Sequence, residues 1–176
     1  MNKLRLLVLS LFSVYAVTAI GVTKEISVVE NFYHSYITAL MKDESCRNLH
    51  ASMDDAFLLE FPEVMDSDEG TYMTNATANT ALYFQVKNET VVNFSVENGL
   101  MASPSSNDVK NSYFCVIFSA QSALHPSLNR NVLQKNTSKL YSEYERDGKS
   151  SSVDGGYKNT FSVDDSRLIY KLEKDK

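Results

Sequence analysis

Residues 26–41 read Ile-Ser-Val-Val-Glu-Asn-Phe-Tyr-His-Ser-Tyr-Ile-Thr-Ala-Leu-Met. Apolar side chains recur here at three- and four-residue steps, which predicts a helix with one apolar face. That face holds Ile26, Val29, Tyr33, Tyr36 or Ile37, and Leu40. The opposite face is polar and carries Glu30, His34 and Thr38. Because the apolar face is broad and aromatic, we expect a sheet to cover it.

Length and composition fit one globular domain. The chain has 176 residues, of which 43% are hydrophobic and 22% charged, so it can bury a core of its own. Ten Tyr and nine Phe, with no Trp, indicate that aromatic rings supply much of that core. The net charge of −5 argues against nucleic-acid binding, which needs a concentrated basic surface.

The N-terminus has the pattern of a secretory signal peptide. Lys3 and Arg5 precede an apolar run, and the small residues before Ala19 suit cleavage after that residue. We therefore expect a signal peptide over residues 1–19 and an exported domain over residues 20–176, in the periplasm or outside the cell. The alternative is an uncleaved inner-membrane anchor over residues 6–22, a run at the lower limit for spanning a bilayer.

The two cysteines, Cys46 and Cys115, are predicted to form one disulfide. An exported chain meets an oxidising compartment, and the cysteine count is even. The bond would link the region after the first helix to a central strand. Two buried free thiols are the alternative.

Between the first helix and residue 80 the patterns are weaker. A charged turn at residues 42–45 precedes a second helical pattern, which Pro62 ends. Its inner face holds Leu49, Met53, Ala56 and Phe57 and could extend to Leu59. We expect a loop over residues 66–70 and irregular structure over residues 71–80.

From residue 81 onward the sequence predicts mainly strands. Residues 112–120, Ser-Tyr-Phe-Cys-Val-Ile-Phe-Ser-Ala, are apolar and rich in aromatic and β-branched residues, which favours a central strand. Asn98-Gly99 is typical of a hairpin turn, because both positions favour positive φ. Residues 139–146 fit a helix or a strand, and residues 148–156 a loop. Further strands are expected over residues 81–86, 92–96, from Leu100, 131–135, 157–163 and 167–173.

These elements predict an α+β domain in which one or two N-terminal helices pack on a curved antiparallel sheet. The pattern of Phe32, Tyr33 and Tyr36 on an opening helix behind a signal peptide resembles small periplasmic NTF2-like (cystatin-like) domains. That resemblance implies a bent sheet wrapped around one long helix. The chain departs from those domains in having no final strand with a Trp, so the resemblance concerns the fold alone.

No catalytic motif surrounds any histidine, and we expect no enzymatic activity, cofactor or metal. His50 and Asp54 stand one helical turn apart, as a solvated ion pair commonly does. His34 belongs to the polar helix face. The spacing of Asp66, Asp68 and Gly70 matches the first positions of a calcium-binding loop. The later positions of such a loop, however, lack the required ligands here. An acidic turn is the expected structure there.

A run of acidic residues is the main candidate for partner binding. Residues 48–86 contain no Lys or Arg, so their charge could steer a basic protein to this region. Solvation of a helix and loop is the alternative explanation. The candidate residues are Asp54, Asp55, Glu60, Glu63, Asp66, Asp68 and Glu69.

Three functions are compatible with these features. The first is a non-catalytic exported binding protein that caps, inhibits or stabilises a protein partner, as immunity or accessory proteins do. The second is a membrane-anchored accessory protein that protects a membrane-bound partner such as a regulator. The third is an NTF2-like small-ligand-binding domain or enzyme, with Tyr33, Tyr36 and Phe118 lining a cavity.

Overall fold

The structure, a computed structural model, describes residues 28–46, 49, 61–99 and 107–175. Its centre is one antiparallel sheet of seven strands in the order β1-β2-β3-β4-β7-β6-β5. The strands are β1 (Glu63–Asp66), β2 (Thr71–Thr77), β3 (Thr80–Lys87), β4 (Thr90–Asn98), β5 (Ser150–Asp154), β6 (Tyr157–Asp164) and β7 (Arg167–Lys174).

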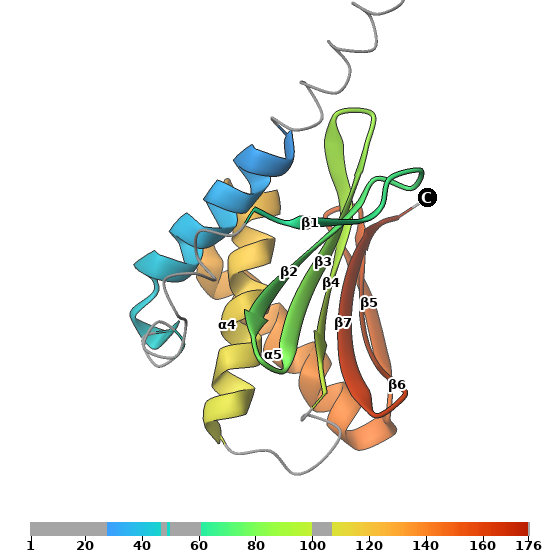
Figure 1. The fold of residues 1–176 in the computed structure, drawn as a ribbon. Helices are drawn as coiled ribbons and strands as arrows, with labels where there is room; N and C mark the ends of the chain where they lie inside the picture. Colours follow the sequence, from blue (N-terminus) through green and yellow to red (C-terminus); the bar gives the residue numbers. More distant parts are fainter. Residues whose placement is uncertain (1–27, 47–48, 50–60, 100–106, 176) are drawn as a thin grey trace, which may run out of the picture.

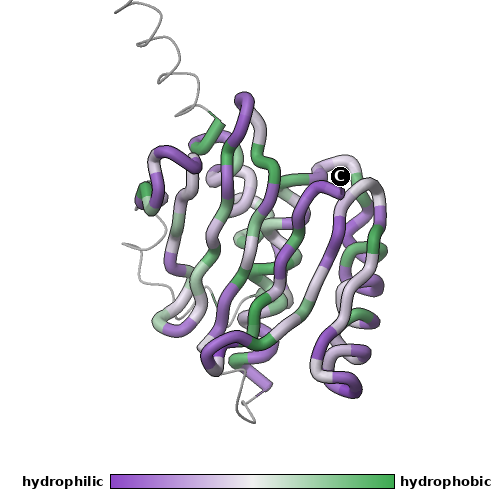
Figure 2. Tube along the Cα trace, turned by 90° about the vertical axis from the view of Figure 1, so that its right-hand side faces the viewer, coloured by the Kyte–Doolittle hydropathy of each residue, from purple (hydrophilic) through white to green (hydrophobic). Residues whose placement is uncertain are grey.

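The helices pack on one face of this sheet (Figure 1). They are the N-terminal helix (residues 28–42), a short 3-10 helix η1 (Glu44–Cys46), α4 (Asn107–Leu124) and α5 (Arg130–Asp147). Figure 2 shows the sheet from its other side, with helices behind it. The predicted fold class, an α+β domain with a helix on a curved antiparallel sheet, is confirmed.

The aromatic core divides between the two halves of the sheet. In the first half, the ring of Phe84 on β3 lies 4.8 Å from Phe32 of the N-terminal helix and 5.6 Å from Tyr72 of β2, between ring centroids. In the second half, Phe161 on β6 lies 5.4 Å from Tyr141 of α5. The N-terminal helix therefore covers β2 and β3, while α5 covers β6.

The buried face of the N-terminal helix agrees with its apolar periodicity. Val29, Tyr33 and Leu40 are buried, and the predicted polar face is exposed at Glu30, His34 and Thr38. Of the two candidates for the same position, Tyr36 is buried while Ile37 is only partly so. Phe32 is also buried, which widens the face toward Phe84. Ile26 lies outside the described residues.

The predicted central strand over residues 112–120 is wrong, because these residues form the middle of α4. Tyr113 through Gln121 are buried except for Phe114, which is half-buried. A helix that is covered on nearly every side loses its amphipathic period, and a short apolar run then cannot be distinguished from a buried strand. The Cys46–Cys115 link therefore joins two helical segments, not a helix and a strand.

Four other predictions also need correction. The expected strand over residues 131–135 belongs to α5, as do residues 139–146, for which helix and strand were both open. Residues 71–77 form β2 instead of irregular structure, and residues 150–154 form β5 within the predicted loop. The hairpin turn predicted at Asn98-Gly99 is wrong, because neither residue has a positive φ and β4 pairs with β3 and β7 instead. A returning strand from Leu100 lies outside the described residues.

The four strands predicted over residues 81–86, 92–96, 157–163 and 167–173 are confirmed, and they form two hairpins. β3 and β4 are connected at Asn88 and Glu89, and β6 and β7 at Asp165 and Ser166, all four with positive φ. Positive φ at both turn positions matches the right-handed twist of the strands. Most of the predicted second helix lies outside the described residues, although Leu49 is helical and buried.

Two buried tyrosines provide a matched test of the core. Tyr113 donates its hydroxyl to the carbonyls of Val96 (3.1 Å) and Leu168 (3.4 Å), whereas the hydroxyl of Tyr36 has no hydrogen-bond partner among the described residues. We expect Tyr113→Phe to lower the free energy of unfolding by about 1–2 kcal/mol, because it leaves buried carbonyls short of a donor. Tyr36→Phe should leave it unchanged or raise it. Urea unfolding measures both, and an equal loss in the two variants would contradict the assignment.

Candidate functional site

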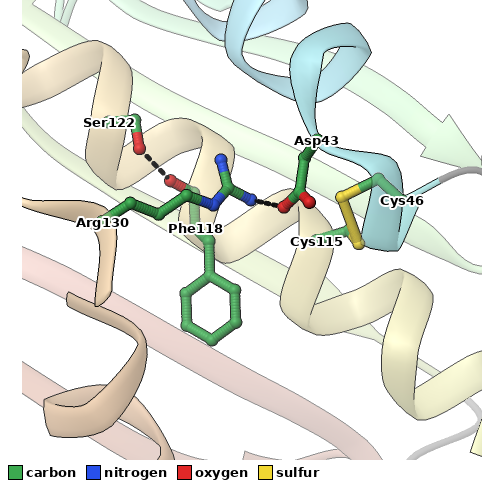
Figure 3. The surroundings of a disulfide bond; sticks show 6 residues. All are labelled: Asp43, Cys46, Cys115, Phe118, Ser122 and Arg130. Atoms are coloured by element: carbon green, nitrogen blue, oxygen red, sulfur yellow. Dashed lines mark hydrogen bonds and ion pairs between the residues drawn. A yellow bond between two sulfur atoms is a disulfide. The ribbon is translucent and has the colours of Figure 1, made fainter. Parts of the chain in front are cut away.

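A disulfide and an ion pair tie the helical layer together (Figure 3). Cys46 of η1 and Cys115 of α4 are bonded, with their Cα atoms 5.6 Å apart. Beside them, the guanidinium of Arg130, the first residue of α5, forms an ion pair with Asp43. Within the described residues, Asp43, Cys46 and Cys115 are also the only group with three potential metal ligands close together. Since the sulfurs are bonded and Asp43 is paired, we assign this cluster a structural role.

The predicted partner-binding acids are only partly within the described residues. Glu63, Asp66, Asp68 and Glu69 lie on β1 and in the turn after it, and all four are exposed. Asp54, Asp55 and Glu60 lie outside the described residues, as does His50. The described acids therefore gather at one edge of the sheet.

The fold supplies a base that the acidic run itself lacks. Lys87, from β3, donates to the carboxylate of Glu69 at 2.9 Å, and this hydrogen bond lowers the pKa of Glu69. Gln85 donates to the same carboxylate. Asp66 accepts the backbone N–H groups of Asp68 (3.0 Å) and Glu69 (3.1 Å), as an Asx turn does. Of Glu63, Asp66, Asp68 and Glu69, Glu69 is thus the one whose charge is balanced by a basic side chain.

Exposed apolar side chains lie among these acids. β1 ends the sheet, and its register with β2 shifts between Val64 and Asp66, so Met65 forms a bulge. Val64 is 59% exposed and Met65 52%. Phe61, two residues before the strand, is 45% exposed. Together with Glu63, Asp66 and Asp68, these three residues form what we call the β1 edge.

A second candidate site is a pocket of about 590 Å³ at the other end of the sheet. It lies between the last turn of α4, α5 and the β5–β6 hairpin, and its volume is within the usual range for small-molecule sites. Its most buried lining residues are Gln121, Thr137, Leu140 and Leu172. Leu128, Val132 and Val153 line it with about half or more of their surface exposed, and so form its rim.

A chain of hydrogen bonds lies at the base of this pocket. The Gln121 amide donates to the Thr137 hydroxyl (2.9 Å) and to the Tyr170 hydroxyl (2.7 Å), and Tyr170 donates to the Asn159 carbonyl oxygen (2.5 Å). Burial raises the pKa of Tyr170, so its hydroxyl keeps the proton that this chain requires. A buried polar network satisfied in this way has one fixed orientation.

His125 forms part of the pocket wall, just after α4. Its ring meets Tyr157 edge to face, with centroids 4.5 Å apart. Within the described residues its ring nitrogens have no hydrogen-bond partner, while its backbone N–H donates to Gln121. Burial lowers the pKa of His125, which favours the neutral imidazole, and a neutral imidazole can both donate and accept a hydrogen bond.

Other sequence-derived candidates are not in either site. His34 is exposed on the N-terminal helix, and Tyr33, Tyr36 and Phe118 are buried in the core without lining the pocket. Gln121, Thr137 and Asn159 are not among the candidates predicted from the sequence. The signal that could have identified them is a polar residue at a position surrounded by apolar core positions. That signal is visible only once α4 and α5 are recognised as helices.

None of three comparisons with known proteins, against family models, curated proteins and solved structures, finds a match to this chain. The resemblance to NTF2-like domains therefore stays a prediction. No helix in the described part of the chain is long and apolar enough to cross a membrane, and the segment over residues 6–22 lies outside that part.

Proposed function

We propose that this chain is an exported, non-catalytic binding protein that holds a basic protein partner on its β1 edge. The observation that carries the proposal is the exposure of Val64 and Met65 between acidic side chains at the end of the sheet. The disulfide and the signal-peptide pattern support export.

The charges of the β1 edge determine which partner fits it. Two copies of this edge would bring Glu63, Asp66 and Asp68 against one another, and like charges disfavour such self-association. A basic partner gains attraction from the same residues, chiefly in its rate of association. The apolar side chains then supply contact area that water otherwise covers. A basic surface with a small apolar patch is therefore the complementary partner.

Site-specific photocross-linking tests this proposal. Benzoylphenylalanine at position 64 should give a protein adduct in the native exported fraction, whereas the same residue at position 163 should not. Val163 is a matched control, because it is a valine on a strand and 46% exposed. Mass spectrometry of the adduct should show a basic partner.

Charge variants provide the second half of the test. The double variant Glu63→Gln/Asp68→Asn should reduce the yield of the adduct at position 64. Raising the ionic strength to a moderate level, with the two charges left in place, should reduce the yield by a similar amount. Asp164→Asn/Asp165→Asn removes two charges in the β6–β7 turn and should leave the adduct unchanged. Both pairs should retain wild-type stability, because exposed charges contribute little to it. Equal adducts at positions 64 and 163, or an acidic partner, would contradict the proposal.

A further inference from the structure

The pocket between α4, α5 and the β5–β6 hairpin is a separate site from the β1 edge, because the two use opposite ends of the sheet. Its base is polar and buried, while much of its wall is apolar: Leu133, Leu140 and Leu172 lie inward, and Leu128 and Val132 at the rim are about half exposed. Apolar walls around a few fixed polar groups are the usual composition of a small-molecule site.

The hydrogen-bond chain leaves one amide with unused capacity. Tyr170 has a single hydroxyl hydrogen, which goes to the Asn159 carbonyl oxygen, while its own oxygen accepts from Gln121. The Asn159 side-chain nitrogen is thereby directed away from the hydrogen bonds that join Gln121, Tyr170 and Asn159. Within the described residues this nitrogen donates one hydrogen bond, to the Tyr157 carbonyl at 3.4 Å. Asn159 can therefore donate to a ligand without disturbing the core.

The charges around the pocket exclude an anionic ligand. Among the described lining residues, the one lysine or arginine is Lys139, whose side chain is 80% exposed and 3.9 Å from the carboxylate of Glu143. Asp154, which also lines the pocket, accepts a hydrogen bond from Asn136. A carboxylate or phosphate placed deep in this pocket would lose its water without gaining a cationic partner.

We propose that this pocket binds a small uncharged amphiphile, whose polar end meets Asn159 and His125 and whose apolar body lies against Leu133, Leu140 and Leu172. A hydroxyl or amide suits the polar end, because Asn159 offers a donor and the His125 ring offers a donor and an acceptor. An aliphatic chain or a ring suits the body. Binding would also cover Val132 and Leu128 at the rim.

The first experiment uses the uncharged fluorophore N-phenyl-1-naphthylamine, which brightens in apolar surroundings, on the full exported chain. We expect saturable binding, displaced by 1-octanol and not by octanoate at neutral pH. Val132→Trp, at the exposed rim, should weaken fluorophore binding about tenfold by filling the pocket. Val163→Trp is the matched control, since it adds the same ring to an exposed valine outside the pocket. Circular dichroism checks that both variants fold.

The second experiment tests the polar end. His125→Phe keeps an aromatic ring against Tyr157 but removes both ring nitrogens. The octanol concentration needed to displace the fluorophore should then rise about fivefold, as expected for the loss of one neutral hydrogen bond. The affinity for the fluorophore itself should not change. The proposal is overturned if wild type shows no saturable binding, or if the two tryptophan variants bind equally. It is also overturned if octanoate competes as well as octanol, or if His125→Phe does not change octanol competition.

Discussion

Replacing both Cys46 and Cys115 with alanine is expected to lower the free energy of unfolding by about 4 kcal/mol, because the bond closes a loop of 69 residues. Without the bond, the unfolded chain regains the freedom that this closure removes. Both cysteines are buried, so the substitution also removes packing between η1 and α4. Urea unfolding of the oxidised wild type, the reduced wild type and the double variant measures the two contributions separately.

The reduced wild type is the informative control for this prediction. It keeps both sulfur atoms in place, so its loss of stability reports loop closure alone. The double variant should be the least stable of the three proteins. If oxidised and reduced wild type unfold at the same urea concentration, the bond does not constrain the unfolded chain as argued.

A charge within the N-terminal helix is expected to have an effect of similar size. Tyr33→Asp should cost about 4 kcal/mol, since it loses a buried ring and places a carboxylate where the side chain is 5% exposed. Ile37→Asp should cost roughly half as much, because Ile37 is only partly buried. His34→Asp is the control, because His34 follows Tyr33 directly and is exposed.

Urea midpoints of the three variants rank these effects. The order Tyr33→Asp, Ile37→Asp, His34→Asp, from most to least destabilised, would support the orientation of the helix on β2 and β3. Equal midpoints for Tyr33→Asp and His34→Asp would show that this face does not contact the sheet.

The predictable parts of the fold are those with a one-sided environment. The N-terminal helix has solvent on one side, so its apolar period is visible. The β3–β4 and β6–β7 hairpins have one buried face each, and their turns carry Asn88 and Asp165, residue types that tolerate positive φ. Each of these elements could be assigned from local pattern alone.

The elements that were assigned wrongly have unusual surroundings. The middle of α4 is covered by the sheet, by η1 and by α5, so residues 113–121 are buried on nearly every side and resemble a strand in sequence. β2 packs with Tyr72, Thr74 and Ala76 inward, and two of these three are weak signals of a buried face. The pocket depends on α5 crossing the β5–β6 hairpin, which no local pattern reveals. The acids of the β1 edge could be identified because the charge of a segment can be read directly from its sequence, without knowledge of the fold.

β4 and β7 are paired in the sheet but far apart in the sequence, and this separation determines when the protein can finish folding. β4 ends at Asn98, and the strand that pairs with it begins at Arg167, so synthesis must continue through both α4 and α5 before that edge is filled. Until then Phe94 and Val96 lack the neighbours that Tyr170 and Leu172 provide. Pairing over so long a separation is slow, and the open edge can join another chain in the meantime. A nascent or truncated chain that stops before residue 167 should therefore be prone to aggregation, even though its first four strands are complete.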